Sequence, residues 1–175
     1  MHELSPKYKF NGRTNLMRKL FYPQYRFHSV YQISPDFLKD KGIKLIILDI
    51  DNTLVMHGGP VDEKAESFIK MMTGSGLYVA LLSNNSKKRL SLFNQDLGLF
   101  SIHRGNKPFV FGYKKIMKNF HVNSKETITI GDQIFTDIMG GNIAGIQTIL
   151  VDPVRVDETK FIRFKRKLEN LVYKR

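Results

Sequence analysis

The chain has 175 residues, 42% of them hydrophobic and 25% charged, which is typical of one globular domain with a sizeable core. It has no cysteine, which excludes disulfides and thiolate metal sites, and no apolar run approaches the roughly 20 residues of a membrane span. The formal net charge of +12 favours an anionic partner, with a solubilising surface charge as the alternative.

Residues 1–42 form the first segment, which is rich in aromatic and basic residues, and we expect it to be an extension that packs on or beside the core. Residues 8–31 interleave aromatic side chains with Lys and Arg, a composition that suits contact with an anionic membrane surface. Residues 15–25 fit a helix stopped by Pro23 equally well. Residues 1–10 lack the apolar stretch of a secretion signal, so we expect a cytoplasmic protein, either soluble or peripheral at the inner face of the membrane.

The segment over residues 43–153 alternates apolar runs with amphipathic ones, and we interpret it as the core. The apolar runs predict strands over residues 43–50, 77–84, 100–104, 126–130 and 146–151. Helical spacing and Gly or Pro boundaries predict helices over residues 62–72, 86–98, 107–120 and 133–145. Pro108 falls near the start of the third helix, where its missing N–H costs nothing. Such alternation predicts an α/β fold, a three-layer αβα doubly wound parallel sheet with ligands bound beyond the carboxyl ends of its strands.

Two aspartates, Asp49 and Asp51, end the first predicted strand. Alternate residues of a strand point the same way, so the two carboxylates emerge together at its carboxyl end. Neighbouring carboxylates repel each other unless a cation lies between them, and donors that are all oxygen favour Mg²⁺. The alternative is that Asp51 or Asn52 caps the next helix while Asp49 is merely exposed.

Three further polar clusters follow along the chain. Ser83 ends the second strand, Lys107 precedes a helix, and Asp132 ends a later strand with Asp137 five positions on. Each has an ordinary explanation: a helix cap, a solvated lysine, or acidic residues favoured by a helix dipole. Their shared place at strand ends argues for function, because the clusters together supply a nucleophile, a hydroxyl donor, a fixed cation and metal ligands. Phosphoryl transfer requires this combination.

The runs that carry these residues, DIDNTL, LLSNN, KP and GDQIFTD, resemble the four motifs of the haloacid dehalogenase-like (HAD) phosphohydrolases. The resemblance covers roughly residues 43–152 and implies the HAD-like Rossmannoid core. The form GDQxxTDxxGGN of the last motif is most similar to subclass IIIA, and within it to the YqeG-type phosphatases. Those are in turn similar to mitochondrial phosphatidylglycerophosphate phosphatases.

The resemblance implies a catalytic role for each matching residue. Asp49 attacks phosphorus and becomes an aspartyl-phosphate. Asp51 protonates the leaving oxygen and then activates the water that hydrolyses the intermediate. The phosphate is bound by Ser83, Asn84 and Lys107, of which Lys107 also offsets the charge on Asp49.

The resemblance also implies a metal site. Mg²⁺ is expected to be held by Asp49, Asp132 and the backbone carbonyl of Asp51. Asp137 is expected to orient either the metal-bound waters or Lys107. The residues with supporting roles are Thr53, Gly131, Gln133, Asp137 and Asn142.

The intervals where a HAD enzyme inserts a cap domain are short. Asp51 and Ser83 are 32 positions apart, and Ser83 and Lys107 are 24 positions apart. Neither interval has room for a large cap domain, so we expect an active site that is open to water. By analogy with the family, cap-free members tend to act on bulky substrates such as proteins, nucleic acids or lipid head groups.

The basic residues concentrate at the two ends of the chain. Residues 1–44 hold nine Lys/Arg against three Asp/Glu, residues 154–175 hold eight against three, and the middle is nearly neutral. We expect residues 154–175 to form a basic amphipathic helix with an apolar stripe of Phe161, Phe164, Leu168, Leu171 and Val172. Such a helix can lie on an anionic membrane, or its stripe can simply pack on the core.

These features lead to one main expectation and two alternatives. We expect a Mg²⁺-dependent phosphomonoester hydrolase acting through an aspartyl-phosphate, with phosphatidylglycerophosphate at a membrane surface as the preferred substrate. The enzymatic alternative is a phosphatase of nucleic-acid ends or nucleotides, which the basic termini would hold. The non-enzymatic alternative is a nucleic-acid-binding or ribosome-binding module on a HAD scaffold. The sequence leaves the oligomeric state open.

Overall fold

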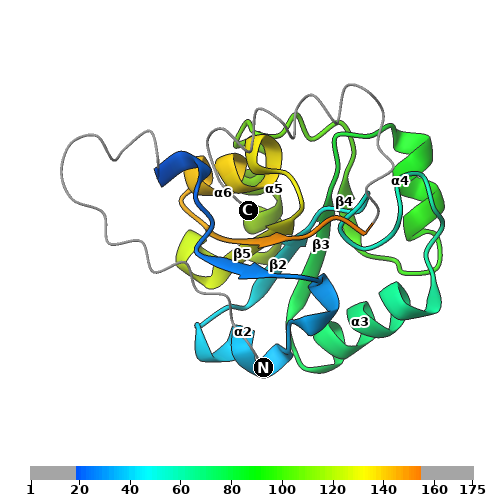
Figure 1. The fold of residues 1–175 in the computed structure, drawn as a ribbon, viewed down its shortest axis with the longest axis horizontal. Coiled ribbons are helices and arrows are strands. Elements are labelled where there is room, and N and C mark those ends of the chain that lie inside the picture. Colours follow the sequence, from blue (N-terminus) through cyan, green and yellow to red (C-terminus); the bar gives the residue numbers. More distant parts are fainter. Residues whose placement is uncertain (1–18, 155–175) are drawn as a thin grey trace.

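The computed structural model of the chain describes residues 19–154, and Figure 1 shows their arrangement. Residues 1–18 and 155–175 lie outside this range. The helix expected over residues 154–175 and the first part of the basic N-terminal segment therefore fall outside the described residues and stay predictions. Within residues 19–154, no helix is both long and apolar enough to cross a membrane.

One sheet of six strands forms the middle of the described structure. All neighbouring strands pair in parallel, in the order β1-β6-β5-β2-β3-β4. The strands are β1 (Tyr25–Phe27), β2 (Leu45–Leu48), β3 (Tyr78–Leu82), β4 (Phe100–Ile102), β5 (Thr127–Gly131) and β6 (Gln147–Val151). The winding direction reverses between β2 and β5, and ligands of such sheets bind beyond the carboxyl ends of the strands at that point.

Helices cover both faces of this sheet, which confirms the predicted three-layer αβα fold. The helices are α2 (Pro35–Asp40), α3 (Glu63–Gly74), α4 (Lys87–Asn94), α5 (Phe111–Phe120) and α6 (Met139–Ala144), with 3-10 turns at Val30–Gln32 and Ser124–Glu126 and a π-helical turn at Ile134–Ile138. Ile46 and Leu48 of β2 share a core with buried residues of α2, α3 and α4. Leu45 and Ile47 point to the opposite face and share a core with α5. Figure 1 shows α5 and α6 on one side of the sheet and α2 and α3 on the other.

The sheet contains one strand more than the sequence predicts. β1 pairs with β6, with Tyr25 opposite Ile149, and forms one edge of the sheet. β4 is equally short, but Tyr25–Phe27 lies in a segment that mixes aromatic and basic residues and so contains no apolar run from which a strand is predicted. The sheet therefore includes residues that precede position 43, where the core was expected to begin.

The third predicted helix begins later than the sequence indicates. α5 starts at Phe111, whereas the prediction starts at Lys107 and places Pro108 in the first turn. The side chain of Asn84 instead holds Lys107 in a loop: its Oδ1 accepts from the Lys107 N–H at 2.7 Å, and its Nδ2 donates to the Lys107 carbonyl at 3.1 Å. This prediction is wrong because a contact between residues far apart in the sequence fixes the segment.

No large cap domain is inserted in the part of the chain that the structure describes. α3 is the only helix between β2 and β3, and the chain between β3 and β5 contains α4, β4, α5 and one 3-10 turn. No inserted domain therefore covers the carboxyl ends of the central strands, as the short intervals predict.

Candidate active site

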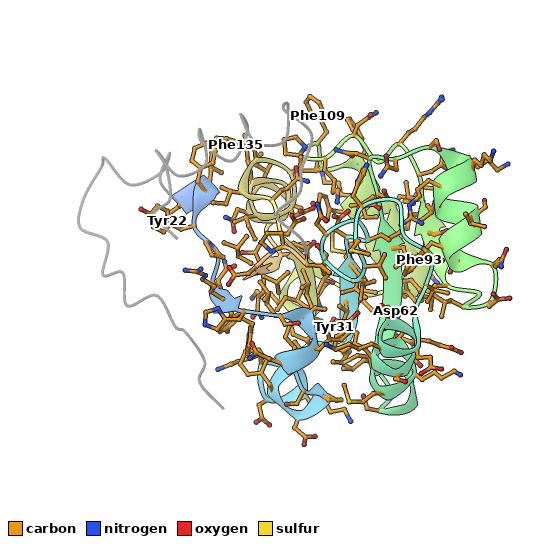
Figure 2. The ribbon with its side chains drawn as sticks, turned by 45° about the vertical axis from the view of Figure 1, so that its right-hand side comes forward. Tyr22, Tyr31, Asp62, Phe93, Phe109 and Phe135 are labelled. Carbon is orange, nitrogen blue, oxygen red and sulfur yellow. The ribbon has the colours of Figure 1, made fainter. Side chains whose placement is uncertain are left out.

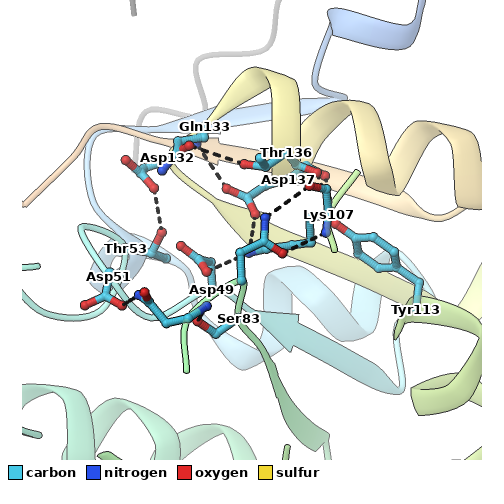
Figure 3. A network of polar contacts seen from close by, with 12 residues as sticks. Asp49, Asp51, Thr53, Ser83, Lys107, Tyr113, Asp132, Gln133, Thr136 and Asp137 are labelled. Carbon is cyan, nitrogen blue, oxygen red and sulfur yellow. Dashed lines mark hydrogen bonds and ion pairs between the residues drawn. The ribbon is translucent and has the colours of Figure 1, made fainter. Parts of the chain in front are cut away.

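Polar side chains from four loops meet at the carboxyl ends of the central strands (Figure 3). They line a pocket of about 310 Å³, formed by Asp49, Asp51, Asn52, His57, Ser83, Asn84, Asn85, Lys107, Gln133 and Thr136. The structure thus brings Asp49, Asp51, Ser83 and Lys107, which the sequence places after separate strands, around one hollow.

The loop after β2 turns sharply at Asn52. This residue has a φ of +65°, a left-handed conformation that Asn tolerates better than most residues, and its N–H donates to the Val55 carbonyl at 2.7 Å. The alternative in which Asp51 or Asn52 caps the next helix is wrong, because Asp62 caps α3. Asp49 is also buried and not merely exposed.

Lys107 is a buried cation that two buried carboxylates share. Its Nζ lies 2.6 Å from Asp49 Oδ1 and 2.6 Å from Asp137 Oδ1. Burial lowers the pKa of Lys107, but Asp137 and Asp49 outweigh burial, so the pKa lies above its ordinary value. Lys107 therefore stays charged, and it is not the solvated lysine of the ordinary explanation.

Asp49 has too little positive charge around it to be a stable carboxylate by itself. Its pKa is raised to about 8, because burial and the neighbouring Asp137 and Asp132 raise it by more than Lys107 lowers it. One carboxylate oxygen from each of Asp49, Asp132 and Asp137 lies within 4.8 Å of the other two. This all-oxygen set of three buried carboxylates, two of which contact Lys107, suits a divalent cation.

Three of the predicted supporting residues hold the aspartates of this cluster. Thr53 Oγ1 donates to Asp132 Oδ1 at 3.3 Å, and the backbone N–H of Gln133 donates to Asp137 Oδ2 at 3.1 Å (Figure 3). A Cβ at Gly131 would collide with the side chain of Asp137, so only glycine leaves room for that carboxylate. Each of the three therefore acts by fixing or accommodating a carboxylate.

Ser83 presents its hydroxyl group to the pocket. The side chain is buried, and its Oγ accepts a hydrogen bond from the N–H of Asn85 at 3.1 Å. It does not cap α4, because Ser86 does so. Among the described residues the hydroxyl hydrogen of Ser83 has no acceptor, so it can be donated to a phosphate oxygen in the pocket.

The carboxylate of Asp51 is held by two side chains that the sequence reasoning missed. Its Oδ1 accepts from the N–H of Gly58 at 2.8 Å and from Arg89 Nη2 and Nε at 2.9 and 3.2 Å. Its Oδ2 accepts from Asn85 Nδ2 at 2.5 Å. No helical spacing marks this pair, because Asn85 precedes the N-cap Ser86 and only Arg89 lies in the first turn of α4.

Comparison with known proteins establishes the family of the chain. The family described as "HAD-hyrolase-like" matches residues 105–156. The chain is 33% identical to the "Probable phosphatase YqeG" of Bacillus subtilis (strain 168) over 158 residues, which cover 90% of this chain and 92% of that protein. The chain belongs to the HAD-like phosphatases. As a member of this family it is a phosphoric monoester hydrolase of the YqeG type.

Two further likenesses fit this assignment. This HAD-like phosphatase is 28% identical over 176 residues to "Phosphatidylglycerophosphate phosphatase 1, chloroplastic/mitochondrial" of Arabidopsis thaliana. The match covers 90% of this chain but only 49% of that relative. The solved structure of the cobalt-bound deoxy-D-mannose-octulosonate 8-phosphate phosphatase of Haemophilus influenzae matches with a TM-score of 0.52 and 18% identity, over 75% of this chain and 88% of that one. At that identity the likeness shows the fold alone.

Asn142 of this HAD-like phosphatase does not line the pocket. It lies in α6, and its Nδ2 is 3.0 Å from each of the carbonyl oxygens of Lys19, Leu20 and Tyr22, to which its two N–H groups can donate. These contacts tie the segment before β1 to α6. The supporting role expected for Asn142 at the site stays a prediction.

Proposed function

We propose that this phosphatase hydrolyses phosphomonoesters through an aspartyl-phosphate on Asp49, with Mg²⁺ as its cofactor. The observation that carries the proposal is the buried pair of Asp49 and Lys107 in a pocket also lined by Asp51 and Ser83. First, a carboxylate oxygen of Asp49 bonds to phosphorus, the bond from phosphorus to the ester oxygen breaks, and Asp51 gives that oxygen a proton. Water then attacks phosphorus while giving a proton to Asp51, which releases inorganic phosphate and restores the carboxylate of Asp49.

Ser83 and Lys107 are the groups that would contact the transferring phosphoryl. The hydroxyl of Ser83 and the ammonium of Lys107 both reach the pocket, where they can donate to phosphate oxygens. Asn84 lines the same pocket, but its side-chain amide is used on the backbone of Lys107 through both Oδ1 and Nδ2. We therefore assign Asn84 to positioning Lys107.

The residues that would hold Mg²⁺ are Asp49, Asp132 and, through its backbone carbonyl, Asp51. The fit rests on the donor chemistry, since Asp49, Asp132 and Asp137 are buried and each offers a carboxylate oxygen within 4.8 Å of the other two. When bound, the ion offsets the negative charge of the phosphoryl group. Asp137 lies in the same cluster, but its two oxygens accept from Lys107 Nζ and from the N–H of Gln133. We therefore assign Asp137 to orienting Lys107.

Phosphatidylglycerophosphate at a membrane surface is the substrate we favour. A relative that covers 90% of this chain is named for that activity, and no cap domain in the described fold limits the bulk of the substrate. The loops around the pocket also expose apolar side chains: Met56 is 48%, Phe109 is 65% and Phe111 is 79% exposed. Figure 2 shows Phe109 at the upper margin of the molecule. Exposed apolar side chains beside a phosphate pocket suit an interfacial substrate.

Release of phosphate from p-nitrophenyl phosphate tests the chemistry. Wild type should be active with Mg²⁺ and inactive with EDTA, and Asp49→Asn should lose about 10³-fold or more of the rate. The exposed acid Asp96 offers a matched control, because Asp96→Asn removes a carboxylate outside the pocket. A wild type no faster than Asp49→Asn would favour a binding module on a HAD scaffold.

The substrate is tested by comparing kcat/KM between classes of phosphomonoester. Phosphatidylglycerophosphate in mixed micelles should give a higher value than 3′-phosphorylated oligonucleotides or nucleotides. The reverse order would favour the phosphatase of nucleic-acid ends, and its basic termini would then hold phosphodiester backbone.

A further inference from the structure

Arg89 places a second, mostly buried cation beside the pocket residue Asp51, against its carboxylate. Its side chain is only 13% exposed, and both Nη2 and Nε contact Asp51 Oδ1. The guanidinium also lies over the ring of Phe93, 5.6 Å from the ring centroid. Phe93 is itself buried between α4 and the sheet (Figure 2). The aromatic ring therefore supports the guanidinium group where it contacts Asp51.

Within the described structure, the guanidinium group of Arg89 donates hydrogen bonds to Asp51 alone. Asp51 is the only hydrogen-bond acceptor that residues 19–154 offer to its nitrogens, and Nη1 is buried without a partner among them. A buried donor without a partner is costly, so a role in the fold alone does not explain the arrangement.

The two oxygens of Asp51 differ in how many donors they accept. Oδ1 accepts from Gly58 N and from two nitrogens of Arg89, whereas Oδ2 accepts only from Asn85 Nδ2. Each carboxylate oxygen has about two lone pairs. Oδ1 is therefore saturated, and Oδ2 keeps one lone pair free to carry a proton.

We propose that Arg89 is a positioning residue, which saturates Oδ1 of Asp51 and thereby makes Oδ2 the oxygen that transfers the proton. This inference rests on the acid–base role proposed for Asp51. In the first step Oδ2 loses its proton to the leaving oxygen as the bond to phosphorus breaks. In the second step Oδ2 takes one proton from the attacking water, so the proton count closes over one turnover.

The inference predicts that Arg89 affects the rate according to the leaving group. A basic leaving oxygen, such as that of an alkyl alcohol, needs a proton in the transition state, whereas p-nitrophenolate leaves without one. A residue that only maintains the fold would change the rates of all substrates alike. A residue that aims Asp51 should matter most where the leaving group is basic.

The test measures kcat and KM of Arg89→Gln and Arg89→Lys on p-nitrophenyl phosphate, phenyl phosphate and glycerol 3-phosphate. For Arg89→Gln, kcat/KM, which reports the step in which the leaving group departs, should fall about 10-fold or more on glycerol 3-phosphate and less than about threefold on p-nitrophenyl phosphate. Arg89→Lys should show a smaller loss with the same order of substrates. Lys88→Gln is the matched control, because it removes an exposed cation next to Arg89 and should leave every rate unchanged.

Asp51→Asn, measured in parallel, separates the two proposals. Asp51→Asn should lower kcat on every substrate, because hydrolysis of the shared intermediate needs the base, but it should lower kcat/KM mainly for basic leaving groups. If its kcat/KM falls equally for all substrates, the role of Asp51 as the acid fails, and the inference about Arg89 fails with it. Asp51→Asn can instead lower kcat/KM mainly for basic leaving groups. If the Arg89 variants then lower kcat/KM equally for all substrates, or for none, only the inference about Arg89 is overturned. Thermal unfolding checks that each variant is folded. If Arg89→Gln is unfolded, the test is decided by Arg89→Lys.

Discussion

Lys107 shows how single residues hold this site together. A buried ammonium is stable only when it is paired, and here two carboxylates pair with it, Asp49 and Asp137. The backbone of Lys107 is fixed in turn by the side chain of Asn84. If Asp137 or Asn84 shifts, Lys107 should therefore shift as well and change its contact with the reacting carboxylate of Asp49.

Gly131→Ala tests this coupling. The added Cβ would collide with the side chain of Asp137, so we expect the free energy of unfolding to fall by about 1–3 kcal/mol and kcat to fall as Lys107 shifts. Denaturant unfolding and phosphate release measure the two effects. Gly74→Ala is the control, because its Cβ would meet no atom within 4 Å at the end of α3, and it should be neutral or stabilising by up to about 1 kcal/mol. Wild-type stability and activity of Gly131→Ala would contradict the coupling.

The sequence predicts the residues of the site that follow strands, and it fails for those placed by contacts between side chains. Asp49, Asp51, Ser83 and Lys107 can be found because the carboxyl ends of parallel strands meet at one edge of the sheet. Arg89 belongs to the second group, because its place at Asp51 depends on how α4 packs. Contacts of that kind leave no periodic pattern in the sequence.

At the scale of the elements, an ion pair ties the edge strand β1 to the end of β6. Arg26 Nη2 lies 3.1 Å from Asp152 Oδ1, and His28 Nδ1 lies 2.8 Å from Asp152 Oδ2. Burial raises the pKa of Asp152, but the hydrogen bonds from His28 and Arg26 outweigh burial and hold the pKa below its ordinary value. The folded state therefore binds this proton more weakly than the unfolded state does.

Asp152→Asn should lower the free energy of unfolding at neutral pH by about 0.5–1 kcal/mol, because the pair is partly exposed and screened. Since the folded pKa lies below the unfolded value of about 3.9, the contribution is present above that pH and is lost as the pH falls through the folded pKa. Denaturation curves at several pH values should therefore converge for variant and wild type in acid. Asp96→Asn, at an exposed position, should show no such convergence. A difference that is the same at neutral and acid pH would contradict this assignment.

Asn142→Ala tests whether α6 anchors the segment that precedes β1. Loss of the hydrogen bonds that the two N–H groups of Asn142 give to backbone carbonyls should destabilise the protein by about 1–2 kcal/mol and speed amide hydrogen exchange over residues 19–27. Activity per folded molecule should stay at the wild-type level, because Asn142 does not line the pocket. A fall in kcat without a change in exchange would instead restore the supporting role that the family resemblance implies.

The order of the elements is predictable from the sequence, whereas some of their boundaries are not. The five strands from β2 to β6 appear as apolar runs, since parallel strands are buried on both faces. β1 is missed because its mixed aromatic and basic residues form no apolar run, and α5 starts late because Asn84 holds Lys107 in a loop. Local pattern therefore predicts the elements of the core, whereas tertiary contacts add the edge strand and decide where α5 begins.

At the scale of the whole molecule, the pocket lies at an edge of the sheet that no inserted domain covers and whose loops expose apolar side chains. Phe109 and Phe111 follow the site residue Lys107 by two and four positions, and both are mostly exposed. A lipid surface would cover these rings while it presents a phosphorylated head group to the pocket.

The double variant Phe109→Ser/Phe111→Ser tests this arrangement. It should float less with anionic vesicles and lose activity on phosphatidylglycerophosphate in micelles, but keep its activity on p-nitrophenyl phosphate. Met71→Ser is the control, because it removes an exposed apolar side chain from the last turns of α3, outside the pocket. Equal flotation and equal lipid activity of the double variant and wild type would exclude these rings as a lipid contact.

The most direct test is to trap the phosphoryl group on Asp49. Asp51→Asn, mixed with Mg²⁺ and p-nitrophenyl phosphate and quenched in acid, should accumulate the intermediate, because this leaving group needs no proton whereas the hydrolytic water needs a base. Mass spectrometry of the digested protein should find one phosphoryl group on the peptide that contains Asp49, and none after Asp49→Asn is added to Asp51→Asn. Hydrolysis of the substrate by an Asp49→Asn variant at the wild-type rate, with no phosphoryl group ever found at Asp49, would contradict the account.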